Sequence, residues 1–127
     1  IADLVLKYQG WALSSEFFDR QCVDPITTNA EGAVRFVQTG QGLNLQLSKC
    51  FRSKYEVAGR YTSIRPASNT TAVSNTTEEC LLGLSQYLNG HRIKLQTYAG
   101  YRWLRSDMAL DAPGNAWTAM FQVEFGI

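Results

Sequence analysis

The chain has 127 residues, enough for one domain with a core or for a series of hairpins. Twelve basic against eleven acidic side chains give a net charge of +1, which argues against a nucleic-acid-binding surface and against an acidic tail. No apolar run reaches the roughly 18 residues of a membrane-spanning helix, so that class is excluded.

Apolar and polar side chains alternate with a period of two along most of the chain, which predicts strands. The first two strands cover residues 2–9 and 11–20 and are joined by a tight turn at Gln9-Gly10. The pattern begins at Ile1 without an initiator Met or a signal peptide, which indicates a mature or truncated N-terminus. A long loop over residues 21–32 follows.

Residues 33–51 predict one long strand, or two strands joined at a bulge around Gly40 and Gly42. Val34 upstream fits the face opposite to that of Leu43, and a one-residue bulge would reconcile the two. A brief turn at residues 52–54 then leads into a strand over residues 55–65.

The second half of the chain predicts three further strands. Residues 66–77 form an uncharged polar loop, and residues 78–88 and 91–105 form a hairpin with a two-residue turn at Asn89-Gly90. After a loop at 106–115, every odd position from Trp117 to Ile127 is apolar and most even positions are polar. This last strand, of about ten residues, has the length of a tilted membrane-crossing β-strand.

The connections between the seven predicted strands alternate between short and long. Outer-membrane barrels have short periplasmic turns and long external loops, so the pattern predicts an all-β, antiparallel transmembrane β-barrel with a periplasmic C-terminus. A soluble barrel would use strands of similar length around an apolar interior. Three features favour the membrane form: a charged polar face, aromatic residues near strand ends, and small residues on the apolar face that would leave voids in a packed core.

The polar face carries long charged side chains that we expect to line a lumen. They are Lys7, Glu16, Arg20, Glu56, Arg60, Arg92, Lys94, Arg102 and Glu124. The arginines would attract anions, because guanidinium groups match phosphate geometry. Alternatively, these charges pair across neighbouring strands and hold the wall in shape, with Lys94 and Glu124 as a candidate pair.

The sequence contains no catalytic or metal-binding motif, so we expect no enzyme, no cofactor and no metal. His91 is the only histidine, and the three cysteines, Cys22, Cys50 and Cys80, include no CxxC pair. Cys50 falls on a polar face and Cys80 on an apolar face, so the two should not meet. Glu78 and Glu79 are adjacent and point to opposite faces of a strand, which argues against joint acid–base work.

Several segments resemble the C-terminal part of the phosphate-selective porin O and P family, especially its members from Bacteroidota. They are residues 2–11 with Glu16-Phe17-Phe18 behind them, residues 54–61, residues 82–96 and residues 121–127. The stretch Tyr-Leu-Asn-Gly-His-Arg-Ile-Lys-Leu-Gln at residues 87–96 is the most specific of these. The resemblance implies passive diffusion of small anions through a water-filled pore.

The same resemblance implies that residues 1–127 are the C-terminal portion of a larger barrel of about sixteen strands. Seven strands would leave two open edges in lipid, so the remaining wall must come from the same chain or from another polypeptide. The family's anion-selective constriction lies largely in the earlier part of the barrel, so selectivity for phosphate does not transfer.

The resemblance further implies a bacterial outer-membrane location and a set of partners. These are outer-membrane lipid, the rest of the barrel and the barrel assembly machinery, with a homotrimer or a larger outer-membrane complex as a further expectation. We expect Phe121, Val123, Phe125 and Ile127 of the closing strand to serve as the assembly signal. Two alternatives remain open: a non-conducting structural barrel subunit of an outer-membrane assembly, and a soluble ligand-binding β-barrel.

Overall fold

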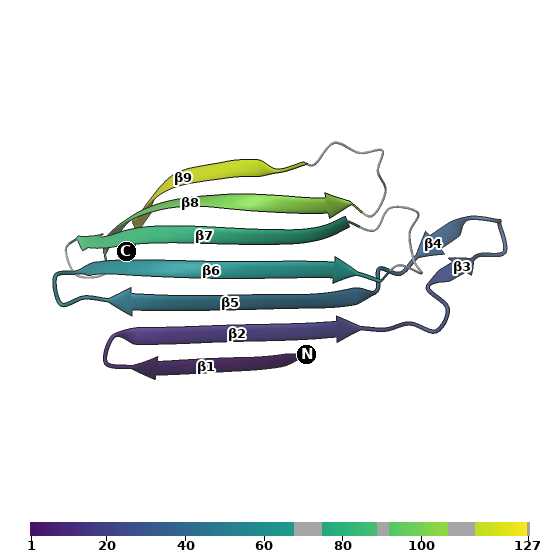
Figure 1. Ribbon diagram of the computed structural model, residues 1–127, viewed down its shortest axis with the longest axis horizontal. Helices are drawn as coiled ribbons and strands as arrows, with labels where there is room; N and C mark the ends of the chain where they lie inside the picture. Colours follow the sequence, from purple (N-terminus) through teal and green to yellow (C-terminus); the bar gives the residue numbers. More distant parts are fainter. Residues whose placement is uncertain (68–74, 89–91, 107–113, 127) are drawn as a thin grey trace.

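The computed structural model describes residues 1–67, 75–88, 92–106 and 114–126, and its regular structure is all strand, with antiparallel pairing throughout. The described residues contain no helix. Seven strands form one sheet in which each strand pairs with the next (Figure 1). These strands are β1 (Ala2–Tyr8), β2 (Trp11–Arg20), β5 (Gly40–Cys50), β6 (Tyr55–Pro66), β7 (Asn75–Leu88), β8 (Ile93–Ser106) and β9 (Ala116–Phe125).

Two turns lie where the sequence predicts them. Gln9 and Gly10 both have positive φ, 45° and 81°, as a two-residue hairpin turn requires. In the turn after β5, the Lys54 N–H donates to the Phe51 carbonyl at 3.1 Å, and Phe51 N–H donates to Tyr55 O at 2.7 Å. The predicted Asn89-Gly90 turn lies outside the described residues, between the paired ends Leu88 and Ile93.

The predicted single strand over residues 33–51 is wrong. Residues 34–36 form β4 (Val34–Phe36), which pairs with β3 (Ile26–Thr28) in a separate two-stranded sheet; β3 lies within residues 21–32, where the sequence predicts a loop. The Asn29 side-chain oxygen accepts the Ala33 N–H at 2.7 Å and closes this hairpin. The change of face between Val34 and Leu43 therefore reflects two sheets, and no bulge is needed.

The main sheet starts afresh at Gly40, whose φ is +148°. A Cβ atom at this position would collide with the Arg65 carbonyl oxygen of β6, so the close pairing of β5 with β6 requires glycine here. Several other boundaries shift by a few residues: β6 runs on to Pro66, β7 begins at Asn75, before the predicted residue 78, and β8 begins at Ile93.

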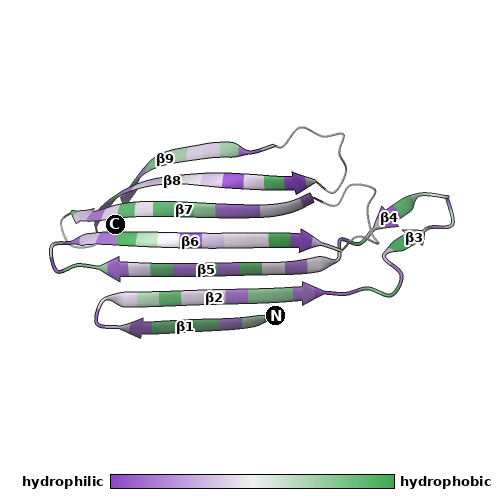
Figure 2. Cartoon of the chain, viewed as in Figure 1, coloured by the Kyte–Doolittle hydropathy of each residue, from purple (hydrophilic) through white to green (hydrophobic). Residues whose placement is uncertain are grey.

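The strand register separates the sheet into two faces. The apolar face is the side that carries Leu6, Leu13, Leu47, Leu82 and Ala119, which lie opposite one another from β1 to β9. The polar face carries the residues between them. The hydropathy of successive residues alternates along the strands accordingly (Figure 2). For the residues that lie in the seven-stranded sheet, the register confirms which of them share a face.

No hydrophobic side chain among the described residues is buried. The buried side chains in the described ranges are polar: Thr39, just before β5, and Ser48, Ser63 and Ser85 within the sheet. Exposure alternates along β7, where Leu82 is 70% exposed and Leu84 half exposed, while Leu81 and Gly83 between them are partly covered and Ser85 is buried. In the central strands the apolar face is thus the more open of the two.

The described strands form an open sheet and not a closed barrel, because β1 and β9 are both edge strands. The two edges run in the same direction, since six antiparallel steps separate them (Figure 1). Each therefore presents unpaired backbone N–H and C=O groups along one side. These open edges agree with the seven-strand prediction.

The short turns are staggered along the sheet. Tyr8 and Trp11 end the first hairpin at the level of Lys49 and Val57, whereas the second hairpin runs on to Phe51 and Tyr55. The third hairpin runs further still, from the level of Tyr55 to Leu88 and Ile93. Such a progression is expected when strands are tilted relative to the line of their turns, as in barrel walls.

Candidate pore wall

The charged side chains predicted to line a lumen lie together on the polar face, with one exception. Those on strands are Lys7 on β1, Glu16 and Arg20 on β2, Glu56 and Arg60 on β6, Lys94 and Arg102 on β8, and Glu124 on β9. Arg92 lies in the turn before β8, where its carbonyl accepts the Gly126 N–H at 2.8 Å. The register therefore brings eight of the nine predicted residues onto one surface.

Arg60 is held by a neutral partner on the neighbouring strand. Gln46 lies directly opposite on β5, and its Oε1 accepts from Arg60 Nε at 3.0 Å and from Nη2 at 2.7 Å. Two donors on one acceptor orient the guanidinium without neutralising it. Arg60 thus keeps its full charge on the polar face.

A second network lies toward the short-turn end of the polar face. The Tyr87 hydroxyl on β7 donates to the Glu56 carboxylate on β6. Lys94 Nζ lies 5.5 Å from the centre of the Tyr87 ring, within cation–π range. Tyr87 therefore links an acidic and a basic member of the predicted set through one aromatic ring.

Lys94 and Glu124 are register partners on β8 and β9, as predicted. Their charged groups are nevertheless not within salt-bridge distance, and in the described part of the chain no two of the predicted lumen charges form an ion pair. Cross-strand ion pairing therefore does not hold this wall together. Two of these charged residues, Arg60 and Glu56, instead form hydrogen bonds with the neutral side chains of Gln46 and Tyr87.

The polar face also carries charges that the sequence-based set omitted. These charges are Asp3 and Glu79. Both lie at the same level of the sheet as Glu16 and Arg102 of the predicted set, with Asn44 and Thr62 on the strands between. Period-two alternation already places Asp3 and Glu79 on this face, so the signal was available. The partners Gln46 and Tyr87 required the register, because no local pattern marks them.

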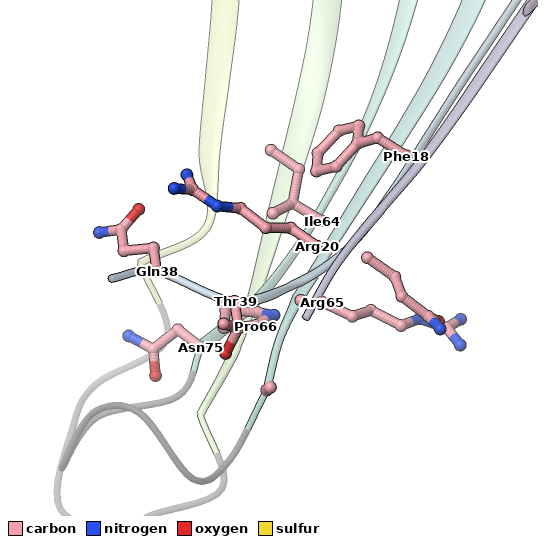
Figure 3. A pocket seen from close by; sticks show the side chains of 11 residues that line it. Phe18, Arg20, Gln38, Thr39, Ile64, Arg65, Pro66 and Asn75 are labelled. Carbon is pink, nitrogen blue, oxygen red and sulfur yellow. The ribbon is translucent and has the colours of Figure 1, made fainter. Parts of the chain in front are cut away.

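A cavity of about 480 Å³ lies at the end of the sheet where the long connections leave it. Arg20, Gln38, Ile64 and Asn75 are among its lining residues (Figure 3). Arg20 and Arg65 leave the sheet on opposite sides (Figure 3), in agreement with their positions in the register. Arg20 therefore lies on the polar-face side of this cavity.

Aromatic side chains border the apolar face at both ends. Tyr8, Trp11, Tyr55 and Phe125 lie toward the short turns, and Phe17, Tyr101, Trp103 and Trp117 lie toward the long connections. The ring of Tyr101 lies 4.9 Å from that of Trp103 and 4.7 Å from that of Trp117. Lys49 lies 4.9 Å from the Trp11 ring and donates to Gln9 O at 2.9 Å.

The height of this apolar band matches a membrane barrel. From Ile93 to Trp103, β8 rises by about 33 Å at about 3.3 Å per residue. With a strand tilt of about 40°, that length spans about 25 Å, the height of the lipid-facing band of outer-membrane barrels.

No family model, curated protein or solved structure matches the chain. The porin resemblance therefore stays a prediction, whereas the all-β antiparallel fold is seen directly.

The predicted assembly signal lies on the apolar side of the edge strand β9. Phe121, Val123 and Phe125 pair in register with Thr97, Leu95 and Ile93, and Phe125 is 72% exposed. Ile127 lies outside the described residues. The unpaired backbone edge of β9 and this row of apolar side chains therefore lie on the same strand at the edge of the sheet.

Other chemistry is sparse in the described ranges. The cysteines are free thiols, and Cys50 and Cys80 lie on opposite faces, as predicted. Within these ranges no three His, Cys, Asp or Glu side chains gather as a metal site. The described residues include no helix long and apolar enough to cross a bilayer. Glu78 and Glu79 do face opposite ways.

Proposed function

We propose that this chain forms part of the wall of an outer-membrane porin, through which small hydrophilic solutes diffuse passively. The observation that carries the proposal is the inverted distribution of polarity. A continuous apolar face is exposed on the more open side of the sheet, while hydrogen-bonded charges occupy the more enclosed side. In membrane barrels the outer surface faces lipid and the lumen is polar.

A soluble barrel fits this arrangement less well. Its apolar side chains would fill the concave side and pack against one another. Here the described residues include no buried hydrophobic side chain, and the polar side is the more crowded. The aromatic borders and the height of the apolar band have no role in a soluble barrel, whereas they match the interfaces of a bilayer.

The open edges support a larger assembly. Unpaired backbone groups are not tolerated in hydrocarbon, since each costs several kcal/mol, so β1 and β9 must be covered by further strands. The covering strands come from the rest of the same polypeptide or from another chain. The basic residues then stand at successive levels of a mixed wall, Arg20 nearest the long connections, then Arg102, Arg60 and Lys94.

Two measurements test the proposal in sequence. Cell fractionation should recover the full-length protein with the outer membrane, and release into the soluble periplasm without detergent would contradict the membrane assignment. Planar-bilayer recording should then show ion conductance. A correctly inserted protein that carries no current would instead be a structural subunit.

We expect the double charge reversal Arg60→Glu and Arg102→Glu to lower the permeability of anions relative to cations. Both guanidinium groups lie on the polar face, and fixed lumen charges set the sign of the ion that a pore attracts. The measurement is the reversal potential across a salt gradient. Arg52→Glu combined with Lys54→Glu, a double charge reversal of the same size in an exposed turn outside the strands, is the matched control. Equal reversal potentials for the double variant and the parent protein would remove the arginines from selectivity.

We also expect Phe125→Ser to reduce the amount of folded protein that reaches the outer membrane. Phe125 lies on the apolar face near the end of β9, at the unpaired edge that an assembly factor would meet. Trp117→Ser is the control, because Trp117 lies on the same face of the same strand and is 80% exposed. Heat-modifiable mobility on gels measures the folded fraction. Equal losses for the two variants would argue against a specific signal at Phe125.

A further inference from the structure

A groove of about 170 Å³ interrupts the apolar face near the long-connection end of β2, β5 and β6. Its walls are Phe17, Leu43 and Tyr61, and its polar lining is Gln41, Ser63 and Arg65. These six side chains belong to neighbouring positions of the same face. The end of the groove nearer the middle of the strands is therefore apolar, and the end nearer the long connections, its outer rim, is polar.

Ser63 is the unexpected member of this set. It is 5% exposed, and its hydroxyl has no hydrogen-bond partner among the described residues. A buried hydroxyl without a partner is destabilising because it has lost its hydrogen bonds to water, so a second molecule that supplies a partner would recover that loss. The residue lies between Tyr61 and Arg65 on the same face of β6.

Two arginines stand at the outer rim of this face. Arg65 ends the groove on β6, and Arg105 lies on β8, opposite Thr76 of the intervening strand. Both are exposed, Arg105 to 74% of its side chain. No interaction of the Arg65 guanidinium is found in the described part of the chain.

The two acidic side chains at this end of the apolar face, Glu78 and Asp19, both have partners within the protein. Glu78 accepts from the Tyr61 hydroxyl at 3.1 Å and pairs with Arg105 Nη2 at 3.3 Å. It therefore ties a wall of the groove to the second arginine. Asp19, opposite Gln41, accepts from Gln21 Nε2 at 2.8 Å and lies two strands from Arg65, about 10 Å away.

We propose that this groove binds an anionic membrane lipid whose headgroup ends in an unsubstituted phosphate. The phosphate lies against Arg65 and within reach of Arg105, the ester region bonds to the Ser63 hydroxyl, and an acyl chain follows Leu43 and Leu45 along β5. Guanidinium groups pair well with phosphate oxygens. Arg65 and Ser63 are about 7 Å apart along the strand, and the order from arginine to serine to leucine matches the order from headgroup to ester to chain.

The inference rests on the proposed membrane location and deepens it. The test uses the full-length protein in a zwitterionic detergent, titrated with phosphatidic acid or with phosphatidylcholine of the same acyl chains. Native mass spectrometry counts the bound lipid. We expect clear preference for phosphatidic acid, a loss of about fivefold in its affinity for Arg65→Gln, and a similar loss for Ser63→Ala.

Matched variants separate the site from general effects. Arg20→Gln removes an arginine at the same end of the sheet on the polar face, and Ser48→Ala removes a similarly buried hydroxyl on that face. Both should leave lipid binding unchanged. Ser63→Ala should also keep or raise the resistance to urea, because the hydroxyl that it removes is unpaired.

Equal affinity for the two lipids, or unchanged affinity in Arg65→Gln, would overturn the inference. Displacement of phosphatidic acid by inorganic phosphate at the same concentration would overturn it too, since the groove would then bind a free anion. A protein that inserts and conducts but shows no lipid preference would contradict only this site. A protein that does not enter the membrane would contradict the proposed function itself.

Discussion

Leu82→Arg should destabilise the inserted protein by about 2–4 kcal/mol, the cost of an arginine at the lipid-facing midplane of a barrel. Leu82 lies on the apolar face in the middle of β7, an inner strand of the sheet, and is 70% exposed. In lipid this exposed position becomes one of the least tolerant to charge. The midpoint of urea unfolding in lipid vesicles measures the effect.

Leu81→Arg is the matched control, because Leu81 is the same residue type one position away on the polar face. It lies opposite Arg60, so a second arginine there adds repulsion of only a few tenths of a kcal/mol, as for other like charges across strands. If Leu82 instead stayed in contact with water, its replacement by arginine would be close to neutral. Tolerance of Leu82→Arg would therefore contradict a lipid-facing apolar surface.

Gly100→Ala should destabilise the protein by about 1–3 kcal/mol, as expected for overpacking at a tight site. A Cβ atom at Gly100 would lie 2.7 Å from the Cys80 carbonyl oxygen and would collide with the Leu81 side chain. Because one neighbour is backbone, β7 and β8 must separate locally, and rotation of a side chain cannot relieve the contact. Urea unfolding again provides the measurement.

Gly83→Ala provides the comparison, since Gly83 lies on the same polar face of the same pair of strands. Its nearest neighbour would be the Tyr98 Cβ atom at 3.7 Å, an ordinary van der Waals contact. Alanine there should stabilise the protein by about 0.5–1 kcal/mol, because it restricts the unfolded chain. Opposite signs are therefore expected, and equal effects would show that the close approach at Gly100 is unimportant.

The face of each residue in the main sheet could be predicted from the sequence because one physical rule decides it. Side chains alternate across a strand, so Leu82 and Leu81 are assigned to opposite faces without any knowledge of their neighbours. Register follows in the first hairpin, where the Gln9-Gly10 turn fixes which residues face each other.

The β3–β4 hairpin could not be predicted in this way. Each of its strands has three residues, too few for a periodic pattern, and the closing contact depends on one Asn29 side chain. The sequence pattern therefore predicts Val34 as part of the same long segment as β5. The resulting error lies in strand length and pairing, while the fold class is unaffected.

The sequence also predicts only part of the candidate site. Which residues lie on the polar face follows from alternation alone. The hydrogen bond from Arg60 to Gln46 depends in addition on the register between β5 and β6, which the sequence does not specify. The groove near Arg65 is even harder to predict from the sequence. Ser63 reads as an ordinary polar interruption of an apolar face, and only its burial and missing partner set it apart.

The common direction of β1 and β9 limits what can complete the wall. A second copy of the sheet set edge to edge about the barrel axis would bring β9 against β1 of its neighbour with both strands pointing the same way. All seven strands described here pair antiparallel, and so do the strands of bacterial single-chain barrels. An insert that keeps this pairing at both seams must contain an odd number of strands, so two copies alone cannot make a uniform ring.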